Sequence, residues 1–275
     1  MTQASSPERA SPAPDLLATI VAAARRIVEV RRQRVPEAAL EKQAAACSPD
    51  GGEFLRALRD GESPRVIAEC KRRSPSRGVL REEYDAAAHA ASYASSGAAA
   101  ISVLTEPTFF DGSLDDLASV RRAVRVPILR KDFIVSRYQI LEAVAAGADA
   151  VLLIVGALDP GELRTLIRQA SAAGVASLVE AHDADELQRA LDCGAEIVGV
   201  NSRNLRTLDV EPELHDRLAS LIPSGIASVA ESGLRRLGDL MRLERAGYKA
   251  FLVGERLITE PDPGAALRRL RRGTS

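Results

Sequence analysis

The stretch AGADAVLL, residues 146–153, carries the signal that decides the fold: a small residue and a glycine, followed closely by an aliphatic run. Glycine suits the position just after a helix, because it readily adopts the left-handed conformation that ends many helices. A short aliphatic run suits a strand that is buried on both faces of a parallel sheet. The stretch therefore predicts the end of a helix and the start of a buried strand.

The same pattern recurs along the chain. Four further copies are SGAAAISV at 96–103, AGVASLV at 173–179, CGAEIVGV at 193–200 and AGYKAFLV at 246–253. Three aliphatic runs lack the glycine: VIAE at 66–69, VPIL at 126–129 and IASVA at 226–230. Because helical patterns follow these runs, eight strand–helix units predict an α/β protein with a closed (β/α)8 TIM barrel. A doubly wound open sheet is the alternative, although no G-x-G-x-x-G phosphate loop follows the first strand.

The first sixty residues precede the barrel pattern. Residues 1–14 are rich in Ser, Pro and Ala and lack the apolar core of a secretory signal, so we expect a disordered lead-in. Residues 15–46 and 54–60 have helical periodicity, with Asp15 as the expected N-cap and Pro36 starting a second helix. We therefore expect one domain over 15–275, in which the helices of 15–60 form an N-terminal extension.

Composition limits the classes of function. The 275 residues are 46% hydrophobic and 27% charged with a net charge of −1, which gives no reason to expect nucleic acid as a partner. No run approaches the roughly 18 apolar residues of a membrane span, so we expect no membrane partner. Cys47, Cys70 and Cys193 are too scattered for a disulfide framework or a zinc site, and a reducing cytoplasm is the expected location.

The residues with chemical potential follow the predicted strands. Only four of the 37 basic residues are lysines, yet Lys71 and Lys131 both stand at strand ends. Glu69 and Lys71 lie two residues apart on a strand and therefore point to the same side. The other polar residues at these ends are Thr105, Glu106, Asp132, Glu180, Asn201, Arg203, Glu231, Ser232 and Glu255. Each alone is compatible with a solvated or salt-bridged rim residue. Together they predict an acid–base site, because barrel enzymes place their active sites at the carboxyl ends of the strands.

The glycines and histidines add two further expectations. Gly233 and Gly254 follow the last two strands, where barrels often bind phosphate through backbone N–H groups. His182, two residues after Glu180, is expected to be a hydrogen-bonded residue at a helix start rather than a ligand. His89 and His215 fall on helical stretches and are expected at the surface. Metal-ligand spacing is absent, so no metal site is predicted.

Several long motifs in the same order resemble the indole-3-glycerol phosphate synthase family. They are AECKRRSPSRG at 68–78, ISVLTEPTFFDGSLDDL at 101–117, PILRKDFIV at 127–135, LVEAHDADEL at 178–187, GVNSRNLRTLDV at 199–210, AESGL at 230–234 and FLVGE at 251–255. The resemblance runs from about residue 16 to 270. It implies a (β/α)8 barrel with the N-terminal helices over the mouth, a phosphorylated small-molecule substrate, and no cofactor or metal.

The resemblance also implies roles for individual residues. Lys131 would be the acid at the substrate's ketone, Lys71 would hold the substrate carboxylate, and Glu180 would be the leading base. Glu69 would take part in a second proton transfer, and Asn201, Glu231 and Ser232 would orient the substrate hydroxyls. The phosphate would be bound by Ser74, Gly233, Gly254 and the backbone of Glu255. The aromatic ring would lie among Phe110, Phe133, Leu205 and Leu234, and Arg203 would be a further substrate contact. Which glutamate acts at which step stays open.

Two other interpretations remain. The barrel could be another phosphate-binding enzyme, such as a sugar-phosphate isomerase or an aldolase that forms a Schiff base on Lys131, or a catalytically silent binding subunit. The intact set of Glu69, Lys71, Lys131 and Glu180 argues against a silent barrel. We expect a monomer, with weak association with other tryptophan-pathway enzymes as the open alternative. Arg256 stands where the family has a small residue, either to add to phosphate binding or to face solvent.

Overall fold

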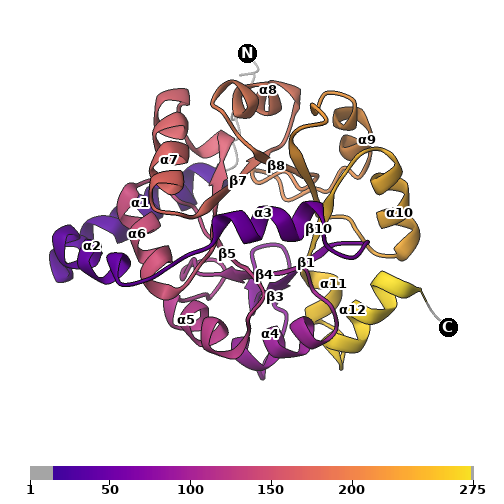
Figure 1. Cartoon of the computed structure of the whole chain (residues 1–275), viewed down its shortest axis with the longest axis horizontal. Helices are drawn as coiled ribbons and strands as arrows, with labels where there is room; N and C mark the ends of the chain where they lie inside the picture. The colour runs from indigo at the N-terminus through magenta and orange to yellow at the C-terminus, as the bar shows by residue number, and fades with distance from the viewer. Residues whose placement is uncertain (1–14, 274–275) are drawn as a thin grey trace, which may run out of the picture.

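Eight parallel strands close into a barrel, so the predicted (β/α)8 architecture is confirmed (Figure 1). The computed structural model describes residues 15–273; the predicted lead-in at 1–14 and the last two residues lie outside this part of the chain. The barrel strands are β1 (Val66–Cys70), β4 (Ala100–Leu104), β5 (Ile128–Lys131), β6 (Ala150–Ile154), β7 (Ala176–Ala181), β8 (Ile197–Asn201), β9 (Ala227–Glu231) and β10 (Ala250–Val253). Around the barrel their order is β1–β10–β9–β8–β7–β6–β5–β4.

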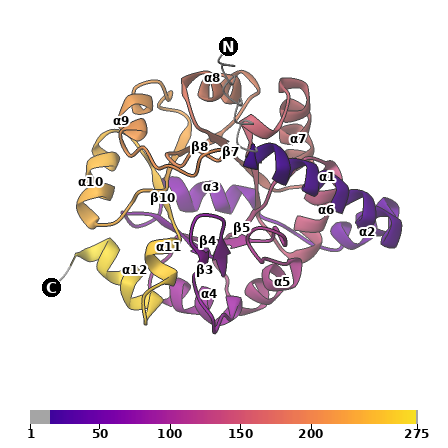
Figure 2. The same ribbon diagram turned by 180° about the vertical axis from the view of Figure 1, so that it is seen from behind.

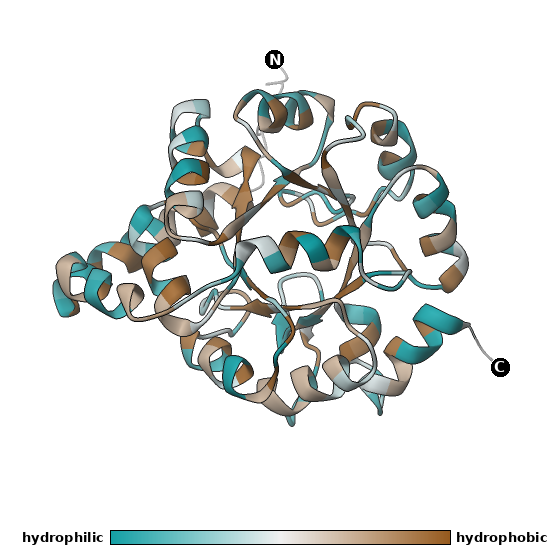
Figure 3. Ribbon diagram, in the orientation of Figure 1, coloured by the Kyte–Doolittle hydropathy of each residue, from teal (hydrophilic) through white to brown (hydrophobic). Residues whose placement is uncertain are grey.

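Helices surround the barrel and cover the outward faces of its strands. They are α4 (Ala86–Ser95), α5 (Leu114–Ala123), α6 (Arg137–Ala146), α7 (Pro160–Ala172), α8 (Ala184–Asp192), α9 (Glu213–Ala219), α10 (Leu237–Arg245), α11 (Glu255–Ile258) and α12 (Pro263–Arg272), with a 3-10 turn η1 (Val155–Ala157). Apolar colour concentrates on the strands and on the inward sides of the helices (Figure 3). This distribution follows from parallel strands that are buried on both faces.

The glycines that mark the repeated pattern end helices, as the sequence predicts. Gly97, Gly147, Gly174, Gly194 and Gly247 all have positive φ, between 79° and 114°. Side chains other than glycine rarely adopt this conformation, and it reverses the chain from each helix into the next strand. The pattern therefore fixed the strand starts correctly.

The N-terminal extension divides between the two ends of the barrel. It contains α1 (Leu16–Arg34), α2 (Glu37–Ala45) and α3 (Gly51–Arg59). Helix α3 crosses the amino-terminal end of the barrel, where the Gly51 N–H donates to the Gly174 carbonyl just before β7 (Figure 1). Helix α2 packs outside the barrel on α6. Only α1 lies on the side of the mouth, against α6 and η1 (Figure 2). The expectation that all these helices lie over the mouth is therefore wrong for α2 and α3.

The expected surface positions of His89 and His215 are also wrong. His215 is 1% exposed, and its Nε2 lies 3.0 Å from the Glu231 carbonyl and 3.2 Å from the Val200 carbonyl. His89 is buried and stacks on Tyr84. Both rings sit on the inward faces of their helices, where backbone carbonyls and an aromatic ring replace water.

A small hairpin follows β1 and stands at the mouth. Its strands β2 (Arg73–Ser74) and β3 (Gly78–Val79) pair antiparallel. Gly78 has a φ of 70°, which the tight turn requires.

In the described part of the chain, no helix combines the length and the apolar character that crossing a bilayer requires.

Candidate active site

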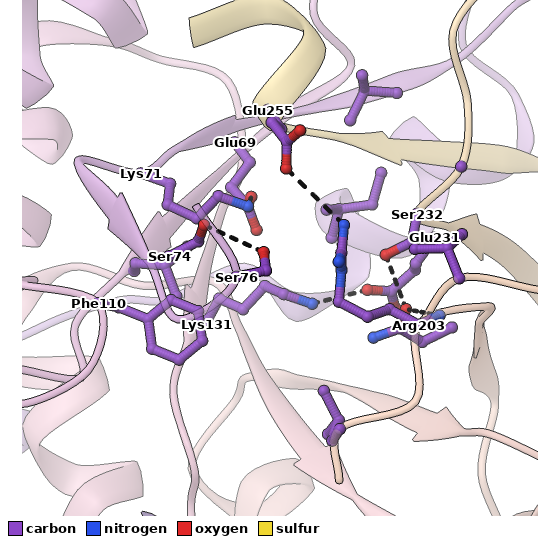
Figure 4. A pocket seen from close by; sticks show the side chains of 18 of the residues that line it. Glu69, Lys71, Ser74, Ser76, Phe110, Lys131, Arg203, Glu231, Ser232 and Glu255 are labelled. Atoms are coloured by element: carbon purple, nitrogen blue, oxygen red, sulfur yellow. Dashed lines mark hydrogen bonds and ion pairs between the residues drawn. The ribbon is translucent and has the colours of Figure 1, made fainter. Parts of the chain in front are cut away.

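All sixteen residues proposed from the sequence line one cavity at the carboxyl ends of the strands. The cavity has a volume of about 760 Å³, within the range of small-molecule sites. In Figure 4, Glu69 and Lys71 lie on one side and Glu231 and Ser232 on the other, with the amine of Lys131 between them. The barrel thus gathers strand ends that lie far apart in the sequence.

Lys131 lies between two buried carboxylates. Its Nζ donates to Glu231 Oε2 at 2.7 Å and to Glu180 Oε2 at 3.0 Å. The three side chains come from β5, β7 and β9, and the two carboxylates are almost fully buried. Burial disfavours the charged amine, but Glu180 and Glu231 outweigh it and hold the pKa of Lys131 above its ordinary value. The amine is therefore a cation in the free enzyme.

The two carboxylates of this cluster differ in protonation. Burial raises the pKa of Glu231 to about 8, with the charge of Glu180 adding to the effect and Lys131 opposing it. For Glu180 burial acts in the same direction, but Lys131 and the adjacent His182 prevail and hold its pKa below the usual range. One proton shared by a carboxylate pair is the expected outcome when two acids lie this close. These directions favour the negative charge on Glu180 and the proton on Glu231.

Small residues make room for these carboxylates. A Cβ on Gly199 of β8 would lie 2.3 Å from Glu231 Oε1, and one on Gly254 would lie 2.0 Å from Glu69 Oε2. Both distances are too short for any side chain without movement of the glutamate. Gly254, the residue after β10, therefore leaves the space that the Glu69 carboxylate occupies.

Glu69 and Lys71 form the second charged pair in the cavity. Lys71 Nζ lies 2.6 Å from Glu69 Oε2, which agrees with the shared side predicted from their spacing. Cys70, between them, is fully buried on the opposite side, and burial raises the pKa of its thiol. Of the two side chains, Lys71 is the more accessible: it lies at the rim of the cavity and is 15% exposed.

Asn201 and Ser232 form a polar shelf beside Glu231. The Ser232 hydroxyl donates to Asn201 Oδ1 at 2.8 Å, and the same oxygen accepts from the Arg203 N–H at 3.0 Å. Ser232 and Gly233 have φ values of 67° and 72°. A left-handed serine costs about 1 kcal/mol, and such strain clusters at functional sites.

Arginines gather where β10 ends. Glu255 accepts from Arg77 Nε at 3.0 Å and lies 3.8 Å from Arg203. Ser74 lies on the hairpin within hydrogen-bond distance of Ser76, and both line the cavity. Arg256 lines the rim and pairs with Glu260, with its side chain 41% exposed. This end of the cavity has the cations and backbone groups that suit a phosphate.

The opposite wall is apolar. Phe110 and Phe133 face each other with ring centroids 6.1 Å apart, and Leu205 and Leu234 also line the cavity. Glu106 holds the turn that carries Phe110, because its carboxylate accepts the N–H groups of Phe109 and Phe110. A flat aromatic group fits such a wall.

Sequence reasoning missed a buried network beneath Lys131. Arg130 is fully buried and donates to Asp132 Oδ2 at 2.8 Å, to Thr105 Oγ1 at 3.0 Å and to Glu142 Oε2 at 3.2 Å. Thr105 and Asp132, which the sequence offered as strand-end candidates for the site, are therefore hydrogen-bond acceptors for the buried Arg130. The alternation along β5 signals this, since Arg130 and Lys131 point to opposite faces. Arg77, Ser76 and Arg235 also line the cavity and were not singled out.

The arrangement supports proton transfer better than covalent catalysis. A Schiff-base lysine must lose its proton, whereas the Glu180 carboxylate 3.0 Å away favours the charged form of Lys131. This disfavours the aldolase interpretation. Within residues 15–273, no group of three or more His, Cys, Asp or Glu side chains is arranged to hold a metal ion.

Comparison with known proteins points to one family. A family model described as indole-3-glycerol phosphate synthase matches residues 17–270. A protein of that name from Parafrankia sp. is 53% identical over 234 residues, which cover 84% of this chain and 86% of the relative. One from Beutenbergia cavernae is 45% identical over 252 residues, covering 92% and 93%.

Solved structures of other enzymes share only the fold. The N-acetylmannosamine-6-phosphate 2-epimerase from Clostridium perfringens has a TM-score of 0.57 at 16% identity, covering 76% of this chain and 91% of the epimerase. A thiamine phosphate pyrophosphorylase from Pyrococcus furiosus has the same TM-score at 17% identity, covering 78% and 95%. These likenesses show a common barrel and nothing about the reaction.

Proposed function

The chain belongs to the indole-3-glycerol phosphate synthase family, and we propose that its sixteen cavity residues carry out the family reaction in the roles that follow. The enzyme closes the indole ring of 1-(2-carboxyphenylamino)-1-deoxyribulose 5-phosphate in tryptophan biosynthesis. It releases carbon dioxide and water and leaves indole-3-glycerol phosphate. The observation that carries the proposal is Lys131, whose Nζ lies 3.0 Å from Glu180 Oε2 and 2.7 Å from Glu231 Oε2 inside the cavity.

Binding places the two ends of the substrate at opposite sides of the cavity. The phosphate lies among Ser74, Gly233, Gly254 and the backbone of Glu255, with Arg203 nearby. The anthranilate ring lies against the apolar wall of Phe110, Phe133, Leu205 and Leu234. Its carboxylate pairs with the Lys71 amine, which already faces the cavity beside Glu69.

Ring closure then proceeds on the Lys131 side. The ring carbon that bears the carboxylate attacks the ketone carbon, and Lys131 gives a proton to the developing alkoxide. The raised pKa keeps the amine protonated, so it has a proton to give once the ketone oxygen becomes the much more basic alkoxide. Loss of carbon dioxide restores the aromatic ring.

Dehydration completes the indole. The hydroxyl left on the former ketone carbon takes a proton from Lys71 and departs as water, while a base removes a proton from the neighbouring carbon. We assign this base to Glu180, because it is the ionised carboxylate of the pair. Glu69 acts in a second proton transfer with Lys71, and Asn201, Glu231 and Ser232 orient the substrate hydroxyls. We also propose a cytoplasmic monomer.

A matched pair of variants tests the assignment. Glu180→Gln removes an ionised base and is expected to lower kcat by about 100-fold or more. Glu231→Gln replaces a protonated acid by an amide of the same shape and is expected to lower kcat by about tenfold or less. Turnover is followed by indole fluorescence after mixing with the substrate. Equal losses in both variants, or the reverse order, contradict the assignment of the base.

A further inference from the structure

His182 lies between two carboxylates at the end of β7, and none of the roles above uses it. Its Nε2 lies 3.2 Å from Glu180 Oε1, and its Nδ1 lies 3.0 Å from Glu186 Oε2. The side chain is 15% exposed. The contact with Glu180 is an ion pair too bent for a well-aligned hydrogen bond, and Nε2 has no other partner within residues 15–273.

The local sequence fixes this geometry. His182 is the first residue after β7 and follows Glu180 by two, and its ring lies against the Glu180 carboxylate. Asp183 caps α8 by accepting the Glu186 N–H at 2.7 Å, which brings Glu186 back over the strand end. There Glu186 Oε2 also accepts the backbone N–H of His182 at 2.9 Å. The cap of α8 therefore holds the imidazole in place.

Glu186 itself has little freedom. A Cβ on Gly156 of η1 would lie 2.8 Å from Glu186 Oε1 and 3.4 Å from Leu17 of α1. The carboxylate is thus enclosed between the turn after β6 and the first helix of the N-terminal extension. Glu186 therefore holds the backbone N–H and the ring of His182 in one position.

The partners define the protonation of the ring. An ionised carboxylate only accepts hydrogen bonds, and both ring nitrogens face one. Both nitrogens therefore carry hydrogen, and the imidazole is a cation. Burial opposes this charge, but Glu180 and Glu186 outweigh it and raise the pKa of His182 to about 10.

Both oxygens of Glu180 are consequently held by cations. Lys131 of β5 binds Oε2 from the cavity side, and His182 binds Oε1 from behind. Within residues 15–273 the cluster is also faced by Glu231 of β9, by the more distant Glu69 of β1 and by Arg189 of α8, whose guanidinium lies 3.8 Å from Glu186 Oε1. When Lys131 turns to the substrate oxygen during ring closure, only the contact with His182 continues to orient Glu180.

We propose that His182, locked by Glu186, is the positioning residue of Glu180: it keeps that carboxylate ionised and oriented for dehydration after Lys131 has engaged the substrate. The inference rests on the proposed role of Glu180 as the base. It assigns His182 no contact with the substrate.

Kinetics of His182→Gln test the proposal, with His89→Gln as a control for the loss of a buried imidazole that does not line the cavity. We expect kcat of His182→Gln to fall about tenfold with KM within about twofold, because a charge-assisted contact to Glu180 is lost. The acidic limb of the kcat profile should move to higher pH, because Glu180 gains a proton more easily. An unmoved limb overturns the proposal even if kcat falls, since a purely structural role predicts that result.

A readout independent of turnover separates this inference from the proposed base. The chain has only three histidines, so the imidazole nitrogens can be assigned in ¹⁵N NMR spectra with single His→Gln variants. In the wild type we expect His182 to remain doubly protonated beyond pH 8, and in Glu186→Gln to titrate at lower pH. Titration of wild-type His182 near its ordinary pKa overturns the ion pair itself. A charged His182 combined with full activity of Glu180→Gln instead overturns the assignment of the base.

Discussion

Replacing Lys131 by methionine is the most direct test of the site. The change keeps the length of the side chain and removes the charge that lies 2.7 Å from Glu231 and 3.0 Å from Glu180. General acids contribute about 10² to 10⁴ in rate, so kcat should fall by at least 100-fold. The contacts to the phosphate and to the substrate carboxylate do not involve Lys131, so the dissociation constant should change by less than about tenfold.

The structure also sets the cost in stability. Removing one partner of a buried ion pair costs about 3–5 kcal/mol when the other charge stays unpaired. Here the cost should lie at or below the low end of that range, because the raised pKa of Glu231 favours its neutral form and His182 still faces Glu180. The variant should therefore remain folded in a thermal unfolding scan.

The assay combines indole fluorescence for turnover with calorimetry for substrate binding. Lys42→Met is the matched control, because Lys42 is an exposed lysine on α2, outside the cavity. A folded Lys131→Met protein with kcat within tenfold of the wild type refutes Lys131 as the acid. Complete loss of substrate binding would instead make Lys131 a binding residue.

Further tests address the opposite side of the cavity and the effect of pH. Lys71→Arg keeps the charge but should lower kcat at least tenfold in the fluorescence assay, because a guanidinium does not give up a proton and is bulkier beside Glu69; a near-normal rate reduces Lys71 to an electrostatic anchor. Gly254→Ala should lower kcat/KM by about tenfold or more, since its Cβ would lie 2.0 Å from Glu69 Oε2; unchanged kinetics contradict the need for that space. His182 has a raised pKa of about 10 in the folded chain, so its stabilising contribution is complete below about pH 6.5 and is lost as the pH rises through about 10. Denaturant titrations at pH 6.5 and 9.5 should show a larger loss of unfolding free energy in the wild type than in His182→Gln, with an upper limit of about 3.5 kcal/mol on the difference; equal losses exclude the linkage.

The sequence predicted the barrel well because its signals are local. The glycine at five of the helix ends and the aliphatic run after it need only a few residues, and both appear in the structure at the expected places. The period of two also placed Glu69 and Lys71 on one side. Since the strand ends of a parallel barrel meet at one mouth, the candidate residues could be grouped without knowledge of any contact.

Long-range pairing was beyond the reach of such signals. Nothing in the sequence indicates that Lys131 binds a carboxylate 100 residues away, or that the extension divides between the two ends of the barrel. The burial of His215 was within reach, because Leu214 and Leu218 on the same short helix are buried with it. Treating a histidine as polar and exposed overlooked the backbone carbonyls that can satisfy it.

The glutamates of the cavity show why residue type alone does not assign a chemical role. Glu180 and Glu231 both lie near the carboxyl end of a strand, both are almost fully buried, and both contact the same amine. They differ in what lies behind them: Glu180 faces the cationic ring of His182, whereas Glu231 Oε1 has no hydrogen-bond partner among residues 15–273 and lies in the space left by Gly199. One environment stabilises a negative charge and the other favours a proton. Which glutamate acts as the base therefore depends on the neighbouring strands. The motif around Glu180 and the motif around Glu231 do not contain that information, so the sequence could not decide between the two residues.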